Sequence, residues 1–87
     1  MILEMYSISI VPSAIKSLKK ISNPYDQKVI ESIQSLSLDP FPNGFKKLKG
    51  RDGYRIRVAD YRVVYSVDKE KQNIIVLNLG HRKDIYS

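Results

Sequence analysis

The chain has 87 residues, no cysteine and a formal net charge of +6. This length suffices for one small domain, residues 1–87, and not for two. The absence of cysteine excludes thiol catalysis, disulfides and thiolate metal sites. Hydrophobic residues make up 43% of the chain and charged residues 28%, which is typical of a soluble globular protein. We find no apolar run of spanning length and no signal peptide, and we therefore expect a cytoplasmic protein with no membrane partner.

The first part of the chain predicts a strand followed by two helices. Residues 1–11 alternate apolar and polar side chains imperfectly, which favours a strand. Pro12 suits the first turn of a helix because its missing N–H donor costs nothing there, and an apolar stripe at helical spacing continues to Ile21. Asn23 and Pro24 interrupt this helix, and they are placed to cap and begin a second one. The short connection predicts an antiparallel helical hairpin that covers one face of a sheet.

The loops of the second half have clear signals. Residues 39–44 contain two prolines and a glycine, which end the second helix. We expect Phe41 and Phe45 to anchor this loop to the core. The polar residues 68–73 suit a chain reversal, and the β-branched run 74–79 predicts a strand that is largely covered on both faces.

The centre of the chain predicts a β-hairpin. Residues 54–58 and 61–65 alternate at period two, and residues 59–60 have the length of a hairpin loop. Opposed residues share a face, so tyrosines and aliphatic side chains gather on one face while arginines gather on the other. The arginine face holds Arg55, Arg57 and Arg62. The element order is β-α-α-β-β-β. It predicts an α+β fold in which a two-helix hairpin packs on one face of a mostly antiparallel four-stranded sheet and the arginine-bearing face stays open.

The converging arginines indicate an anion site. Like charges placed opposite one another destabilise a sheet, and the planar guanidinium fork suits phosphate well. A solvated polar face remains the simpler interpretation of any single arginine. Residues 46–57 hold six basic side chains and one acid, so a local positive field favours nucleic acid or an acidic protein as partner. The upstream residues that we expect to contact RNA are Lys46, Lys47, Lys49 and Arg51.

The residue types limit the chemistry. There is one histidine, no glycine-rich phosphate loop and no recognisable metal spacing, so we expect neither a metal nor a cofactor. RNA carries its own nucleophile, the 2′-hydroxyl, and its cleavage needs mainly orientation, charge stabilisation and proton transfer. Arg55, Arg57, Arg62 and Arg82 are candidates for charge stabilisation, and His81 and Tyr86 for proton transfer. Simpler interpretations stay open: His81 is a partly exposed residue that ends a strand, and Tyr86 packs down or lies disordered. A functional Tyr86 could also stack on a base or donate a hydrogen bond to the phosphate.

Four segments resemble the signature of the RelE/ParE superfamily of bacterial and archaeal toxins. They are residues 47–50 (KLKG), 54–57 (YRIR), 60–65 (DYRVVY) and 80–86 (GHRKDIY). The ending resembles the RelE branch, whose members are ribosome-dependent endoribonucleases that cut messenger RNA in the A site. By position, the resemblance implies a catalytic set of Arg55, Arg57, Arg62, Arg82 and Tyr86, and metal-independent attack that leaves a 2′,3′-cyclic phosphate. The best-studied pattern has lysines where this chain has Arg55 and Arg57, so we assign phosphate stabilisation to Arg57 rather than a general-base role.

The resemblance also implies partners and alternatives. It implies a cognate antitoxin, a small acidic or DNA-binding protein, and contact with operator DNA only through the complex of toxin and antitoxin. The ribosome and its message are the other expected partners. The ParE branch, whose members inhibit DNA gyrase, is one alternative. A basic binding module or decayed toxin without enzymatic activity is another.

Overall fold

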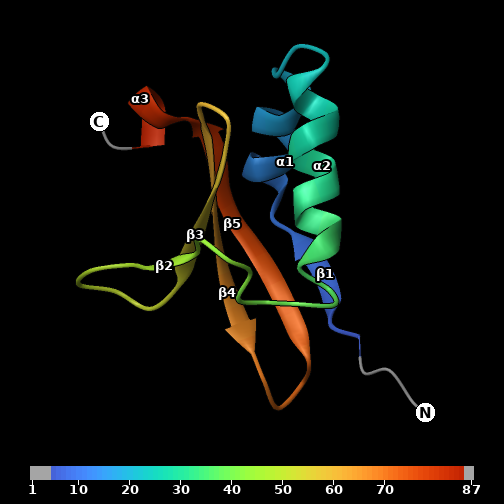
Figure 1. Cartoon of the computed structure of the whole chain (residues 1–87), viewed down its shortest axis with the longest axis vertical. Coiled ribbons are helices and arrows are strands. Elements are labelled where there is room, and N and C mark those ends of the chain that lie inside the picture. The colour runs from blue at the N-terminus through green and yellow to red at the C-terminus, as the bar shows by residue number, and fades with distance from the viewer. Residues whose placement is uncertain (1–4, 86–87) are drawn as a thin grey trace.

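The computed structural model describes residues 5–85, which form a layer of helices on one sheet (Figure 1). The elements in chain order are β1 (Ser7–Ile10), α1 (Pro12–Lys19), α2 (Tyr25–Ser35), β2 (Lys46–Lys47), β3 (Tyr54–Val58), β4 (Tyr61–Asp68), β5 (Asn73–His81) and α3 (Arg82–Ile85). Tyr86 and the first four residues of the expected strand 1–11 lie outside the described residues.

The sheet has the strand order β1-β5-β4-β3-β2. β1 runs parallel to β5, and the remaining neighbours are antiparallel. The predicted α+β class is therefore confirmed, but the predicted strand count is wrong because β2 adds a fifth strand. β2 consists of two exposed lysines. Two charged residues carry no alternating pattern, so only their pairing with β3 identifies them as a strand.

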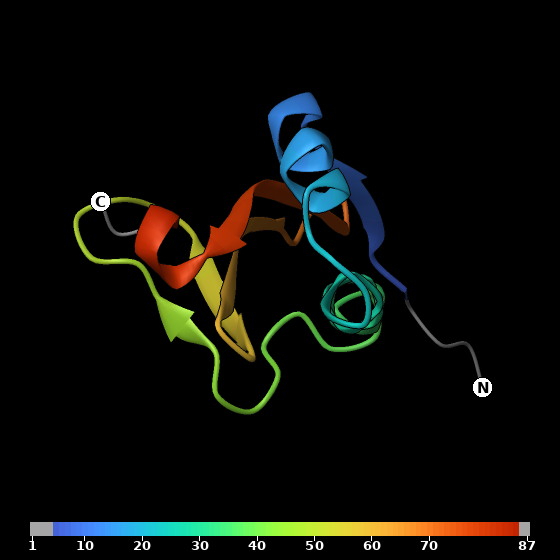
Figure 2. The ribbon, with the colours of Figure 1, turned by 90° about the horizontal axis from the view of Figure 1, so that it is seen from above.

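The two long helices cover one face of the sheet. α1 packs against β5, and α2 packs against β3 and β4. Figure 2 shows α1 and α2 on one side of the sheet and α3 on the other. α1 begins at Pro12 as expected. The expected cap by Asn23 is wrong, because Pro24 takes the N-cap position and the first N–H groups of α2 bond to the Ser22 carbonyl oxygen. The largest fully buried side chains between the layers are Val29, Leu36, Val63, Tyr65, Ile74, Val76 and Leu79.

An aromatic cluster anchors the loop that follows α2. The rings of Phe41 and Phe45 lie 5.3 Å apart, and Phe41 contacts Tyr54 edge-on at 5.0 Å. Tyr54 in turn lies 5.9 Å from Tyr65, whose hydroxyl donates a 2.7 Å hydrogen bond to the Pro40 carbonyl oxygen. The expected anchoring by Phe41 and Phe45 is confirmed. The loop thereby holds β2 against the exposed edge of β3.

Substituting Tyr65 with phenylalanine should change how stability depends on alkaline pH. Burial, then the charge of Asp39 and the neighbouring Tyr54, raises the pKa of the Tyr65 hydroxyl from 10.0 to about 12. The unfolded chain therefore loses this proton first, and the hydroxyl's contribution to stability falls as pH rises from 10 to 12, by at most about 1.4 kcal/mol per pH unit. Urea unfolding at several pH values should show the wild type losing stability relative to Tyr65→Phe across this interval. Parallel curves would contradict this assignment.

The face opposite the long helices is only partly open, contrary to expectation. Val64, which alternation places beside the arginines, is 1% exposed. α3 packs against this face, since the Ile85 Cδ1 atom lies 3.8 Å from where a β-carbon on Gly80 would stand. The expectation that residues 74–79 are covered on both faces is also wrong. A bulge in the β4–β5 pairing accompanies Leu77, which is 40% exposed.

Candidate nucleic-acid interface

The strand register sets cations side by side in two rows across the sheet. Pairing of β2, β3 and β4 gives one row, and pairing of β3, β4 and β5 gives the next. The first row is Lys46, Arg55 and Val64, and the second is Arg57, Arg62 and Gly80. Each row therefore places two cations directly opposite one another, and like charges in this arrangement repel.

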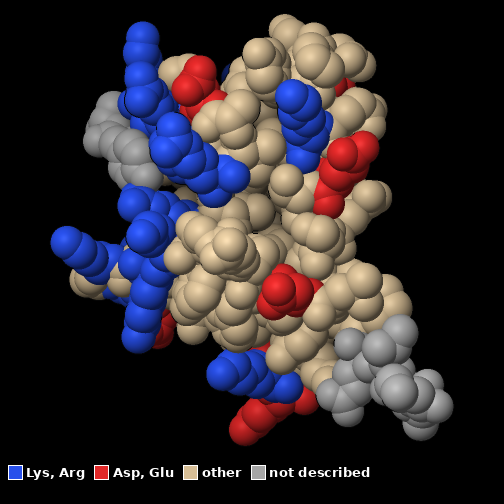
Figure 3. Space-filling view, in the orientation of Figure 1, with Lys and Arg blue, Asp and Glu red and all other residues tan. Residues whose placement is uncertain are grey.

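These cations line one small cavity. Its volume is about 150 Å³, and its lining residues are Gly44, Lys46, Arg55, Arg57 and Arg62. The expected convergence of the three arginines is confirmed, and the structure adds Lys46 from β2. Figure 3 shows lysine and arginine side chains gathered on the side of the molecule that carries β2 and α3. A cavity bounded by guanidinium and ammonium groups fits an anion such as a phosphodiester.

The arginines of the cavity differ in burial. Arg57 is exposed and Arg55 is half-buried, whereas Arg62 is only 8% exposed. The Arg62 Nη1 atom donates hydrogen bonds to the carbonyl oxygens of Tyr61, at 2.9 Å, and Ala59, at 3.3 Å. Ala59 lies in the left-handed region with φ of 53°. Arg62 is thus held in place by the turn between β3 and β4, and its orientation needs no ligand.

The same turn fixes the start of α3. The backbone N–H of Arg82 donates a 2.8 Å hydrogen bond to the Asp60 carbonyl oxygen. Arg62 and Arg82 are therefore both hydrogen-bonded to carbonyl oxygens of residues 59–61. The Arg82 side chain is exposed and does not line the arginine cavity. Tyr86, the other C-terminal member of the implied catalytic set, lies outside the described residues.

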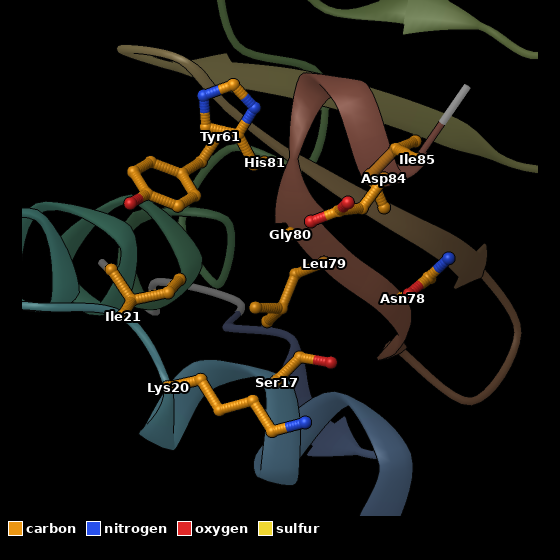
Figure 4. Close-up of a pocket in the computed structure, with 10 residues that line it drawn as sticks. All are labelled: Ser17, Lys20, Ile21, Tyr61, Asn78, Leu79, Gly80, His81, Asp84 and Ile85. Atoms are coloured by element: carbon orange, nitrogen blue, oxygen red, sulfur yellow. The ribbon is translucent and has the colours of Figure 1, made fainter. Parts of the chain in front are cut away.

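His81 lies away from the arginine cavity. It pairs with Tyr61 across β4 and β5, and the two rings meet edge-on at 5.7 Å. Its Nδ1 atom accepts a 3.2 Å hydrogen bond from the Lys83 backbone N–H, so the neutral ring carries its proton on Nε2. Figure 4 shows His81 beside Tyr61 in a separate pocket of about 360 Å³, which Lys20 and Asp84 also line. The structure does not bring His81 together with the three arginines.

A groove adjoins the arginine cavity on the side of β2. Its volume is about 460 Å³. It is lined by the other basic residues singled out from the sequence, Lys47, Lys49 and Arg51, together with Lys46 and Arg55. Three aliphatic side chains complete it: Leu48, Val64 and Ile85. Sequence reasoning found the cations of this groove but missed its apolar part, because Val64 and Ile85 are far apart in the chain.

The described residues offer two further observations. No three or more histidine, aspartate or glutamate side chains among residues 5–85 are grouped so as to hold a metal ion. Within the same residues, every helix is too short or too polar to cross a bilayer. The candidate site is lined mainly by lysine and arginine side chains, with a small aliphatic surface beside them.

Solved structures with this fold include chains of toxin–antitoxin complexes. A chain of the archaeal RelE–RelB complex from Pyrococcus horikoshii OT3 aligns with a TM-score of 0.81 and 31% identity, covering 90% of this chain and 96% of that one. A chain of the RelB–RelE antitoxin–toxin complex from Methanococcus jannaschii aligns with a TM-score of 0.74 and 27% identity, covering 91% and 95%. The fold and its cationic face thus define a RelE-like toxin.

Sequence comparison assigns the family. The model of the ParE toxin of type II toxin–antitoxin systems, parDE, matches residues 8–86. The Methanocaldococcus jannaschii protein named "Putative toxin RelE1" is 31% identical over 85 residues, covering 93% of this chain and 94% of that protein. The chain belongs to the ParE toxin family of type II toxin–antitoxin systems, within the RelE/ParE superfamily.

Proposed function

We propose that this toxin is a ribosome-dependent endoribonuclease that cleaves messenger RNA in the A site and so inhibits translation. The observation that carries the proposal is the cavity where Lys46, Arg55, Arg57 and Arg62 meet. Arg57 and Arg62 lie directly opposite one another, and a bound phosphodiester would offset the repulsion between them. Action on translating ribosomes places the toxin in the cytoplasm.

The reaction needs no metal under this proposal. The RNA 2′-hydroxyl attacks the adjacent phosphorus, its proton passes to a base, and the bond from phosphorus to the 5′-oxygen breaks. The leaving 5′-oxygen takes a proton, and the products are a 2′,3′-cyclic phosphate and a 5′-hydroxyl. Arginine does not give up its proton in a protein, so the arginines act by stabilising the additional negative charge of the transition state.

The side chains divide by how firmly they are held. Arg62 is fixed by two backbone carbonyl groups and supplies a preorganised donor. Arg55 and Arg57 complete the contact with the phosphate. Arg82 does not line the cavity, and we assign it to charge stabilisation beside the cavity, from the start of α3. Lys46, Lys47, Lys49 and Arg51 bind the flanking RNA. Tyr86 is the proposed proton-transfer residue. His81 is a weaker candidate, because it faces Tyr61 in another pocket.

The proposed partner that controls activity is an antitoxin encoded beside the toxin. The solved relatives include RelE–RelB complexes. Residues 46–57 hold six basic side chains and one acid, and this local positive charge favours an acidic partner that covers the cationic face. The complex, rather than the toxin alone, would contact operator DNA. The cationic face would then bind either messenger RNA or the antitoxin, but not both at once.

Reconstituted translation tests the proposal. Purified toxin with ribosomes and a defined message should produce cuts within codons, with 2′,3′-cyclic phosphate ends, and should leave ribosome-free message intact. The Arg62→Ala/Arg82→Ala double variant should not cut, whereas Lys71→Glu, altered in the exposed β4–β5 loop, should cut normally. Equal cutting by the double variant and the wild type would refute the proposed site.

Inhibition of DNA gyrase is the second candidate, because the matched family model is that of the ParE toxin. It predicts loss of gyrase supercoiling on adding the toxin, with messages intact in the translation assay. Supercoiling measured on the same protein preparation separates the two functions. Inhibited supercoiling together with uncut message would replace the first proposal with the second.

A further inference from the structure

We infer that the groove beside the arginine cavity is a nucleobase pocket, which receives the base of the nucleotide adjoining the phosphate in the cavity. This inference rests on the proposed RNA substrate and extends it from the phosphate to a base. The groove, of about 460 Å³, is lined by five cationic side chains and by the aliphatic side chains of Leu48, Val64 and Ile85. Its volume is within the range of roughly 300–1,000 Å³ that is usual for small-molecule sites.

The arginine cavity and the groove are adjacent, as the phosphate and the base of a nucleotide are. Lys46 and Arg55 line both of them. These two residues are directly opposed on β2 and β3, where paired side chains lie about 4.5–5.5 Å apart. One hollow is bounded by four cations and a glycine, and its neighbour adds an aliphatic surface. A nucleotide presents the matching pair, an anion and a flat, weakly polar base, at a distance set by its sugar.

The aliphatic surface is built by the fold from three separate elements. Val64 is 1% exposed on β4, beneath the region that α3 covers. Ile85 comes from α3, whose start is fixed by the bond from Arg82 to Asp60. Leu48 comes from the loop after β2, and its N–H donates a 3.0 Å bond to the Gly53 carbonyl oxygen.

Gly53 lets that loop approach β4 closely. Its φ is 130°, and a β-carbon there would lie 3.1 Å from Leu48 Cδ1 and 3.2 Å from the Tyr65 carbonyl oxygen. A side chain at position 53 would therefore push Leu48 out of place. The apolar lining of the groove depends on tertiary packing and is not a chance exposure of one residue.

The chemistry of the groove favours a nucleotide over an acidic peptide. Five cations line it, which suits a polyanion of closely spaced phosphates. Only three aliphatic side chains line the groove, so they match one flat ring rather than the long apolar stripe of a peptide helix. The expected occupant of the groove is therefore single-stranded RNA. Binding of an acidic peptide alone would overturn the inference.

The test measures binding of a short fluorescent single-stranded RNA and of the same RNA with abasic nucleotides. Removing the bases should weaken binding to the wild type by about fivefold or more, because the abasic RNA keeps its phosphates but no longer buries apolar surface against the aliphatic side chains. In Ile85→Ala and in Leu48→Ala, the same removal should cost less than about twofold, because the base and the side chain act as a coupled pair. The two substitutions lie in different elements, so a local structural change caused by one of them would not be reproduced by the other.

Control variants separate base contact from phosphate contact. Ile15→Ala, at a position that is 39% exposed on α1, should keep the full dependence on the base. Arg57→Ala should weaken binding of both RNAs by the same factor, because Arg57 lines the cavity and not the groove. Thermal unfolding of each variant confirms that it is folded before binding is measured.

Several results would overturn the inference. These are equal affinity of the wild type for intact and abasic RNA, an unchanged dependence on the base in both Ile85→Ala and Leu48→Ala, and binding of an aspartate-rich and glutamate-rich peptide but of neither RNA. Message cleavage is scored separately in the translation assay. A base-dependent affinity without cleavage would support the nucleobase pocket and refute the proposed function. Cleavage without base dependence would support the proposed function and refute the nucleobase pocket.

Discussion

An Arg57→Glu variant should unfold at a higher temperature than the wild type and yet lose at least about a hundredfold in message cleavage. Arg57 is directly opposed to Arg62 on the neighbouring strand. An opposite charge at position 57 converts a repulsive cross-strand pair into an attractive one, a gain of about 0.5–1 kcal/mol. In a chain of this size, such a gain raises the melting temperature by a few degrees. Cleavage falls because a carboxylate repels the phosphate.

Calorimetry and the translation assay measure the two effects on one preparation. The matched control is Lys71→Glu, which changes the net charge equally but lies in the exposed β4–β5 loop. It should change neither cleavage nor the balance of charge on the arginine face. If Arg57→Glu destabilises the fold, the like-charged pair is not strained in the free protein. If it also cleaves normally, the cavity is not the phosphate site.

An Arg62→Ala variant should lose both activity and stability. Removing a preorganised donor from an oxyanion site costs roughly 10²–10³-fold in rate, which is the loss expected for message cleavage. Arg62 is also 8% exposed, and its Nη1 atom bonds to the Ala59 and Tyr61 carbonyl oxygens. Loss of a charged donor to these groups should lower the free energy of unfolding by about 1–3 kcal/mol.

Two comparison variants distinguish these roles. Arg57→Ala removes an exposed cation of the same cavity and should reduce cleavage without lowering stability. Arg62→Lys keeps the charge, but a single ammonium group cannot reproduce the planar fork, so it should restore stability only partly and cleavage less. Urea unfolding and initial cleavage rates measure the three variants together. An Arg62→Ala variant that is as stable as Arg57→Ala would show that the bonds to the turn contribute little.

Local patterns in the sequence determined the central hairpin and its charged face. Alternation in residues 54–58 and 61–65, with a two-residue gap, predicted that Arg57 lies opposite Arg62, as the register shows. This works because strand side chains alternate strictly and a short loop leaves few registers. The predicted start of α1 at Pro12 and the anchoring by Phe41 have similarly local causes. The α+β class followed from the order of such elements.

Tertiary structure decided how the chemical groups are distributed around that hairpin. Pairing of β5 with β4 set His81 against Tyr61 and away from the arginine cavity. Packing of α3 buried Val64 and built the groove, and the β3–β4 turn fixed Arg62. β2 is recognised as a strand only by its pairing with β3. Some of these contacts join residues that are distant in the chain, and others are hydrogen bonds to backbone carbonyl groups. Neither kind of contact leaves a periodic signal in the sequence. The amino-acid pattern therefore specified which cations share a face, and long-range packing specified which of them are rigid and what lies beside them.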